Sequence, residues 1–254
     1  MTGTHSAASF RLAYVPGVTP AKWVRTWAER VPDVPLELIA VSVADAATAL
    51  RDGTADAALL RLPIDRTGLS AIPLYTEASV VVVPKDHEVT AVDEVSVANL
   101  ADYISLHPLD DCLEWESLPG PPANDRPATT GDAVELVAAG VGLLVVPQSL
   151  ARLHHRKDLT FRPMTDAPQS RVALSWPEEQ TTDLMEEFIG IVRGRTVNSS
   201  RGRTAPPPAV QATPTKQTKQ KASESGGARK KSATGKPGSG AAKGSTRGKP
   251  RRRT

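Results

Sequence analysis

The sequence predicts an α/β fold, and the order of apolar patterns in its first 63 residues carries that prediction. Runs rich in β-forming residues at 10–15, 36–43 and 55–62 alternate with two stretches of helical periodicity. The run at 55–62 is almost continuously apolar, which suits a strand buried on both faces. Strands that alternate with helices are typical of a parallel sheet with right-handed crossover connections.

The first helix is expected after the strand at 10–15 and the turn residues Pro16-Gly17. Thr19 offers an N-cap, and Pro20 suits the first helical position because its missing N–H would be unpaired there in any case. Pro32 ends the helix. Its apolar side chains fall on one face at helical spacing: Trp23, Val24, Trp27 and Val31.

The later elements follow from the same patterns. Further strands are predicted at 71–84 (one long strand, or two with a bend), 104–107, 143–146, 159–164 and 171–176. Further helices are predicted at 45–52, at 97–103, from the capping pair Thr129-Thr130 to Gly140, at 147–153 and at 181–195. The segment 108–128 is rich in Pro, Gly and Asp and is expected to be a loop.

Charge divides the chain into two parts. Residues 197–254 contain fifteen Lys and Arg and one acid, Glu224, whereas residues 1–196 hold the other 16 basic and 27 acidic side chains. The formal net charges are therefore +14 and −11. The basic segment has two Val and no larger apolar side chain. It cannot bury enough apolar surface to offset its ordering entropy, so we expect a disordered basic C-terminal tail at 196–254.

Several classes of protein are disfavoured by composition. A single cysteine, Cys112, leaves no intrachain disulfide and no all-cysteine zinc site. No run of 18 apolar residues and no secretory signal is present, so a cytoplasmic protein without a membrane partner is expected. Common catalytic motifs such as Gly-x-Ser-x-Gly and the phosphate-binding loop are missing, and the histidines match no metal-ligand spacing. We therefore expect no enzyme activity, no cofactor and no metal.

Two passages carry a family resemblance. Residues 49–63 read ALRDGTADAALLRLP, and residues 132–147 read DAVELVAAGVGLLVVP. The second passage, a helix followed by Gly-x-Gly, a strand and a proline, is the more specific of the two. Together they resemble the effector-binding domain of LysR-type transcriptional regulators, and the resemblance extends over about residues 10–195.

The resemblance implies a two-lobed fold of the type-2 periplasmic-binding-protein kind. Lobe 1 would consist of 10–84 plus 162–195, and lobe 2 of 85–161, with a disordered N-terminus at 1–9. A small polar or anionic metabolite would bind between the lobes, where strands end and helices begin. The resemblance also implies side-by-side dimerisation. Family members carry an N-terminal winged helix-turn-helix, but only nine residues precede the first predicted strand here, so we expect no helix-turn-helix in this chain.

The first group of candidate effector contacts lies at the starts of two helices. Gly17, Val18 and Thr19 precede the first helix, and Thr129 and Thr130 precede the corresponding helix of lobe 2. Backbone N–H groups at such ends favour a carboxylate or phosphate. The alternative is that the threonines only cap their own helices, and both roles are compatible.

The other candidates come from strand ends. Arg61 interrupts a buried apolar run and is predicted either to pair with an anionic ligand or to form an internal ion pair with Asp65 or Glu77. Four more positions complete the predicted effector site. Thr76 lies at the predicted hinge, and His107 lies at the end of the short strand of lobe 2. Val146 and Pro147 occupy the position that faces the cleft in the family.

The tail is the second predicted functional feature. Its basic residues have no interleaved aromatic side chains, so they suit non-specific neutralisation of DNA phosphates and not base stacking. The expected contacts are Arg229, Lys230, Lys231, Lys236, Arg247, Lys249, Arg251, Arg252 and Arg253. We expect an effector-binding protein of transcriptional regulation. The alternative is a nucleoid-type DNA-associated protein whose globular part serves only dimerisation or partner binding. A simpler interpretation is that the tail is a solvated linker, or that it folds back on the acidic domain.

Overall fold

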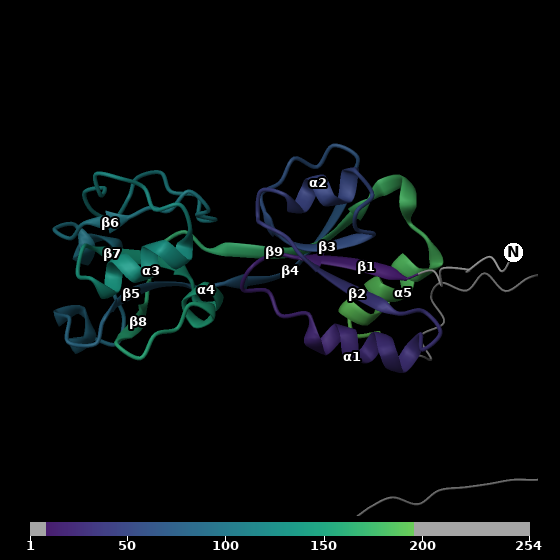
Figure 1. The fold of residues 1–254 in the computed structure, drawn as a ribbon, viewed down its shortest axis with the longest axis horizontal. Helices are drawn as coiled ribbons and strands as arrows, with labels where there is room; N and C mark the ends of the chain where they lie inside the picture. The colour runs from purple at the N-terminus through teal and green to yellow at the C-terminus, as the bar shows by residue number, and fades with distance from the viewer. Residues whose placement is uncertain (1–8, 196–254) are drawn as a thin grey trace, which may run out of the picture. The chain divides into compact units, whose positions relative to one another are not determined.

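A computed structural model describes residues 9–195, and within them two β-sheets are joined by two crossing segments (Figure 1). The first sheet has the strand order β2-β1-β3-β9-β4, and the second has the order β6-β7-β5-β8. The α/β class and the two-lobed architecture predicted from the sequence are confirmed. The predicted tail at 196–254 and its proposed DNA contacts lie outside the described residues.

The first sheet is parallel at one side and antiparallel at the other. Its strands are β1 (Phe10–Tyr14), β2 (Leu36–Ala40), β3 (Ala57–Leu62), β4 (Leu69–Glu77) and β9 (Ser170–Pro177). Strand β1 pairs in parallel with both β2 and β3, with Leu12 opposite Leu38 and Ala57. Strand β9 pairs antiparallel with β3 and β4 and brings the C-terminal part of the chain back to this sheet. Three helices accompany these strands: α1 (Ala21–Arg30), α2 (Ala46–Arg51) and α5 (Asp183–Val192).

An aromatic cluster forms the centre of this first core. The ring of Phe10 stacks on Trp27 with centroids 4.7 Å apart, and Phe188 lies 5.2 Å from Phe10 and 5.8 Å from Trp27. These three side chains come from β1, α1 and α5 and are at most 2% exposed. Burial of such large rings supplies much of the apolar area that holds helix and sheet together.

The second sheet is built from a continuous stretch of chain. Its strands are β5 (Ser79–Pro84), β6 (Ser105–Leu106), β7 (Leu143–Pro147) and β8 (Leu159–Pro163). Two helices, α3 (Thr130–Ala138) and α4 (Gln148–Leu153), pack on this sheet together with the 3-10 turns η1 (Glu88–Ala91) and η2 (Val97–Leu100). A further turn, η3 (Glu178–Gln180), follows β9 of the first sheet. The four valines of β5 alternate between two separate apolar cores, one on each face of the sheet.

The crossings between the sheets differ from the predicted lobe boundaries. The predicted strand at 71–84 is two strands, and Ala78 separates β4 of the first sheet from β5 of the second. The return crossing runs through 164–169, between β8 and β9. Strands β5 and β8 therefore belong to the second sheet, whereas boundaries at 84 and 162 would assign β5 and the end of β8 to lobe 1. Below, lobe 1 means residues 9–77 plus 170–195, and lobe 2 means residues 79–163.

Two local predictions are wrong in detail. The predicted helix at 97–103 is the 3-10 turn η2. Thr19 does not cap α1, because Pro20 already has helical dihedrals, φ −79° and ψ −7°, and the helix begins without a side-chain cap. Within residues 9–195, no helix combines the length and apolar character needed to cross a membrane.

Candidate functional site

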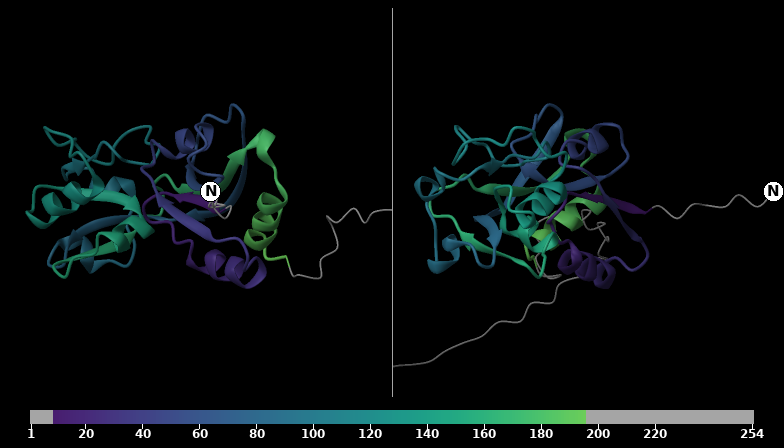
Figure 2. Two further views of the ribbon diagram at one scale, coloured as in Figure 1. Left: turned by 45° about the vertical axis from the view of Figure 1, so that its right-hand side comes forward. Right: turned by 60° about the vertical axis from the view of Figure 1, so that its left-hand side comes forward.

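A hollow of about 470 Å³ lies where the two lobes meet. Its floor is formed at the carboxyl ends of the parallel strands β1 and β2, the edge at which α/β sheets usually bind ligands. Helix α4 of lobe 2 lines its other side through Ser149, Arg152 and Leu153. Figure 1 labels this helix, and Figure 2 shows the ribbon from two further sides. Its lining residues are Tyr14, Pro16, Gly17, Val18, Thr19, Ala40, Val41, Ser149, Arg152 and Leu153.

The walls of this hollow are mostly apolar, with few polar groups. Thr19, Ser149 and Arg152 provide the polar side chains besides the phenol of Tyr14. Arg152 is exposed, and its guanidinium forms no ion pair within residues 9–195. An apolar cavity with one cation and a few hydroxyls suits a small organic anion.

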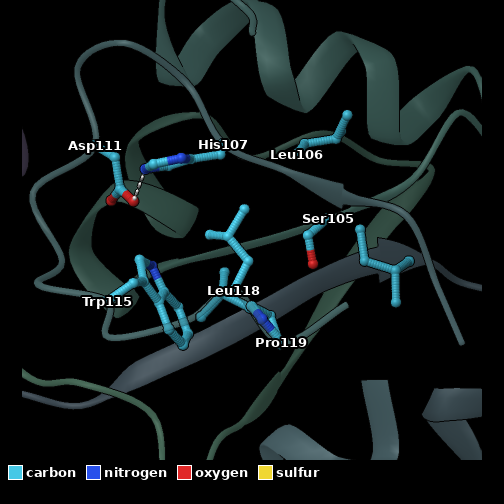
Figure 3. Close-up of a pocket in the computed structure, with 9 residues that line it drawn as sticks. Ser105, Leu106, His107, Asp111, Trp115, Leu118 and Pro119 are labelled. Carbon is cyan, nitrogen blue, oxygen red and sulfur yellow. Dashed lines mark ion pairs between the residues drawn. The ribbon is translucent and has the colours of Figure 1, made fainter. Parts of the chain in front are cut away.

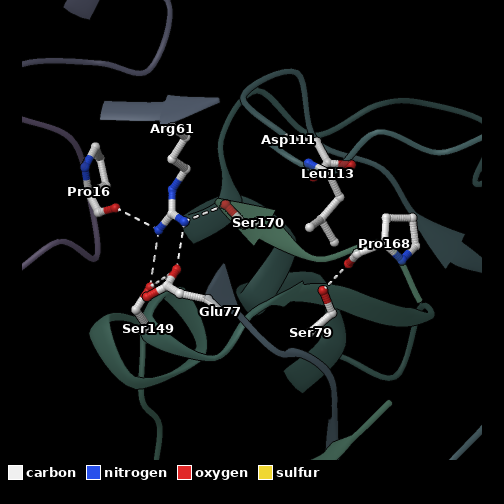
Figure 4. Close-up of polar contacts among 9 residues, drawn as sticks. All are labelled: Pro16, Arg61, Glu77, Ser79, Asp111, Leu113, Ser149, Pro168 and Ser170. Carbon is white, nitrogen blue, oxygen red and sulfur yellow. Dashed lines mark hydrogen bonds and ion pairs between the residues drawn. The ribbon is translucent and has the colours of Figure 1, made fainter. Parts of the chain in front are cut away.

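A buried ion pair lies beside the hollow (Figure 4). Nη1 of Arg61 donates to Oε2 of Glu77 at 2.6 Å and to Oγ of Ser170 at 2.7 Å. Nη2 of the same guanidinium donates to the carbonyl oxygen of Pro16 at 3.2 Å and to Oγ of Ser149 at 3.1 Å. Arg61 is 2% exposed, so its charge is compensated internally.

Of the two predicted roles for Arg61, the structure therefore contains the internal ion pair. Glu77 is the partner, whereas Asp65 pairs with Arg51 at 3.0 Å. Because Glu77, two hydroxyls and a carbonyl already occupy both terminal nitrogens, the guanidinium has little left to offer a ligand. Its Nε is the buried side-chain polar atom that lacks a hydrogen-bond partner among the described residues.

The predicted helix-start residues separate into two groups. Gly17, Val18 and Thr19 all line the hollow. Thr129 and Thr130 do not: Thr129 forms a capping box with Asp132, and Oγ1 of Thr130 donates to Asp110 at 2.9 Å. A carboxylate of the chain thus already occupies the start of α3.

The remaining predicted positions also lie away from the hollow. Thr76 is exposed on β4, and Val146 and Pro147 pair with β5 inside the second sheet. His107 lines a water-sized cavity within lobe 2, where its Nε2 lies 3.2 Å from Oδ2 of Asp111 (Figure 3). Burial raises the pKa of Asp111, while the imidazole and the backbone N–H of Leu113 oppose this rise.

Cys112 lies near the buried ion pair and is half-buried. Burial raises the pKa of its thiol to about 11, although the positive charge of Arg61 and a contact with Ser170 act in the opposite direction. The thiol is therefore protonated at neutral pH, and the nucleophilic thiolate is scarce.

Most residues that line the hollow were not predicted from the sequence. Ser149 and Arg152 lie three residues apart on α4 and so share a helix face, but this spacing does not show which partner the face meets. Tyr14 and Val41 follow from the rule that ligands bind at the carboxyl ends of parallel strands. The contact of α4 with the loop after β1 depends on tertiary packing and has no local signal.

Comparison with known proteins gives a consistent assignment. A family profile described as LysR substrate binding domain matches residues 5–196. A probable hydrogen peroxide-inducible genes activator of Mycobacterium leprae is 31% identical over 154 residues, which cover 56% of this chain and 49% of that protein. The corresponding activator of Mycobacterium avium is 33% identical over 155 residues, with coverage of 56% and 50%. The chain thus spans about half the length of the curated relatives it matches.

Solved structures confirm the architecture. The BenM effector-binding domain with its effector benzoate superposes with a TM-score of 0.63 at 19% identity, covering 81% of this chain and 99% of that one. The oxidized form of OxyR superposes with a TM-score of 0.60 at 18% identity, covering 74% and 95%. At these identities the likeness concerns the fold alone. Because the profile matches most of the chain, the chain belongs to the LysR substrate-binding domain family, the effector-binding domain of LysR-type transcriptional regulators.

Proposed function

We propose that the chain senses a small organic anion in the hollow between β1, β2 and α4 and passes the signal on in transcriptional regulation. The observation that carries this proposal is the hollow itself, a cavity of about 470 Å³ with mostly apolar walls and one cationic side chain, Arg152. Pockets of this size and polarity bury most of a small ligand's surface and fix its orientation through a few polar contacts. We propose that the hollow binds its ligand and does not transform it.

The chemistry of the walls suggests the class of ligand. Val18, Val41 and Leu153 offer an apolar surface, while Arg152, Thr19 and Ser149 offer donors for one acidic group. Because Glu77 neutralises Arg61, Arg152 is the cation available to the ligand at this place. We therefore propose a ligand with a single carboxylate or similar acid on an aromatic or branched apolar body.

The mycobacterial relatives are named for a response to hydrogen peroxide. The cysteine content of this chain does not favour peroxide sensing. Cys112 is its one cysteine, so an intrachain disulfide cannot form. Its pKa of about 11 keeps the thiol protonated, and thiols react with oxidants as thiolates. We infer that a reversibly bound metabolite, and not peroxide, is the signal.

The first experiment is calorimetric titration of the protein with a panel of small aromatic and branched carboxylates, starting with benzoate and its neutral analogue benzamide. Arg152→Gln should weaken binding of a responding acid by about 10-fold to 100-fold, since a hydrogen bond to a charged group contributes about 1.5–3 kcal/mol. Lys157→Gln is the matched control, because it removes one exposed positive charge of lobe 2 that does not line the hollow.

Two results would contradict the proposal. One is that no acid in the panel binds or raises the melting temperature. The other is that Lys157→Gln weakens binding as strongly as Arg152→Gln, which would assign the effect to net charge alone.

We further propose that the basic segment 196–254 contacts DNA phosphates without reading sequence. The support is its charge pattern, with fifteen basic side chains and one acid between 197 and 254. Binding of random-sequence duplex DNA by the full chain should fall steeply with salt, by about 0.9 in the log–log slope for each phosphate contact. A truncation ending at residue 196 should not bind; equal binding by both forms would assign any DNA contact to the acidic domain.

A further inference from the structure

One side chain of lobe 2 forms hydrogen bonds with two residues of lobe 1. Ser149, the second residue of α4, accepts a hydrogen bond from Nη2 of Arg61 at 3.1 Å and donates one to Oε2 of Glu77 at 3.0 Å. Both partners belong to lobe 1, on β3 and on the last position of β4. In Figure 4, dashed lines join the serine hydroxyl to the guanidinium and to the carboxylate.

The contact of Ser149 with Glu77 lies next to the chain crossing, so it constrains the angle between the lobes. Glu77 immediately precedes Ala78, where the chain crosses from the first sheet to the second. Across the crossing, the backbone N–H of Gln148 donates to the carbonyl of Ala78 at 3.0 Å. Helix α4 is therefore tied to the crossing by its first residue and to the buried ion pair by its second.

Steric contact reinforces the hydrogen bonds. Gly17, in the loop after β1, approaches α4 so closely that a Cβ atom in its place would lie 2.6 Å from Oγ of Ser149 and 3.1 Å from Cδ2 of Leu150. The backbone of lobe 1 and the side chains of α4 are thus in direct contact. A movement of α4 away from Gly17 would break this contact together with the hydrogen bonds of Ser149.

We propose that the Ser149 hydroxyl is a latch through which the hollow controls the arrangement of the lobes. Ser149 lines the hollow and also holds the Arg61–Glu77 pair, so it is the side chain shared by the two sites. A serine hydroxyl has one proton to donate. A ligand acid that accepts this proton takes it from Glu77, which retains its contact with Nη1 of Arg61. Ligand binding thus removes one of the two hydrogen bonds that hold α4 to lobe 1.

This inference deepens the proposed function, because it describes how occupancy of that hollow is read out. Its first part needs no ligand: the apo protein is held in one arrangement by Ser149. The two parts are therefore tested separately.

Electron paramagnetic resonance measures the arrangement directly. Nitroxide labels are placed at the exposed positions Glu29 on α1 and Lys157 beyond α4, each changed to cysteine in a Cys112→Ser background. The parent should give one narrow distance distribution, whereas Ser149→Ala should give a broader or shifted one. Ser175→Ala is the matched control, because Ser175 is fully buried on β9 and donates to the carbonyl of Ser70 at 2.8 Å, entirely within lobe 1.

The outcomes separate the hypotheses. If Ser149→Ala leaves the distribution unchanged, or if Ser175→Ala alters it equally, the latch is refuted whatever binds in the hollow. If the latch holds without ligand, a saturating acid from the calorimetric panel should shift the parent distribution toward that of Ser149→Ala. An acid that binds without any shift would refute the read-out through Ser149 and leave the proposed binding site standing.

Discussion

Gly17 and Ser149 belong to different lobes, yet a Cβ atom on Gly17 would lie 2.6 Å from the hydroxyl oxygen of Ser149. Gly17 also has a φ of +83°, in the region that residues with side chains rarely adopt. Gly17→Ala should therefore destabilise the protein through backbone strain of about 1–3 kcal/mol, with the steric clash added to it. Urea unfolding followed by Trp fluorescence measures the loss.

The chain provides the control for this substitution. Gly53 has a similar φ of +73°, and a Cβ atom there would meet nothing within 4 Å. Gly53→Ala should therefore report the backbone cost alone. Combining Gly17→Ala with Ser149→Ala should recover part of the difference, and strict additivity of the two changes would contradict a direct clash.

The buried Arg61–Glu77 pair should be costly to break from one side. Glu77→Ala leaves a guanidinium that is 2% exposed without its counter-charge, so the protein should lose about 3–5 kcal/mol of unfolding free energy. Replacing both residues by Met should recover much of this loss, because apolar side chains need no compensation. Thermal unfolding of the single and double variants measures both effects. The exposed pair of Arg51 and Asp65 is the control, and Arg51→Met should change the melting temperature little.

The thiol of Cys112 should make stability depend on alkaline pH. Its folded-state pKa of about 11 exceeds the unfolded value of about 8.5, so the folded state holds the proton more tightly. The resulting stabilisation is fully present below about pH 8.5 and is lost as the pH rises toward 11. Urea midpoints between pH 7.5 and 10.5 should fall more steeply for the natural protein than for Cys112→Ser. Parallel curves would show that this thiol is not stabilised in its neutral form.

The aromatic cluster of lobe 1 should dominate its stability. Phe188 is fully buried against Phe10 and Trp27, so Phe188→Ala should cost about 3–5 kcal/mol. Leu38 on β2 is 45% exposed, and Leu38→Ala should change stability far less. Denaturant unfolding of both variants tests the contrast, and similar losses would show that the cluster is not the centre of this core.

Local patterns predicted the elements well because each strand or helix is encoded within a few neighbouring residues. The apolar run of β3, the valines of β5 and the helix start predicted at Thr129-Thr130 are examples. The sequence does not decide between one strand and two over 71–84, because residues on both sides of Ala78 favour strands and only their tertiary partners assign them to different sheets. The lobe boundaries predicted from the sequence differ from the observed sheet boundaries for the same reason.

The candidate site was predictable only on one side. Gly17, Val18 and Thr19 follow from the general rule that ligands meet the carboxyl ends of parallel strands. The choice between Glu77 and Asp65 as the partner of Arg61 needed coordinates, because the strand pairing of β4 with β9 decides which carboxylate comes close. Ser149 and Arg152 are likewise placed by the contact of α4 with lobe 1, which no local pattern encodes.

The return of β9 to the first sheet sets the order in which the chain can fold during its synthesis. Strand β9 pairs between β3 and β4, and α5 completes the aromatic cluster, so lobe 1 is finished only once residues 170–192 have left the ribosome. Lobe 2 is one continuous stretch and can assemble beforehand, since domains fold as units from the N-terminus. Until then, the edges of β3 and β4 that later receive β9 stay open, and this nascent stage is the one most exposed to mispairing with other chains.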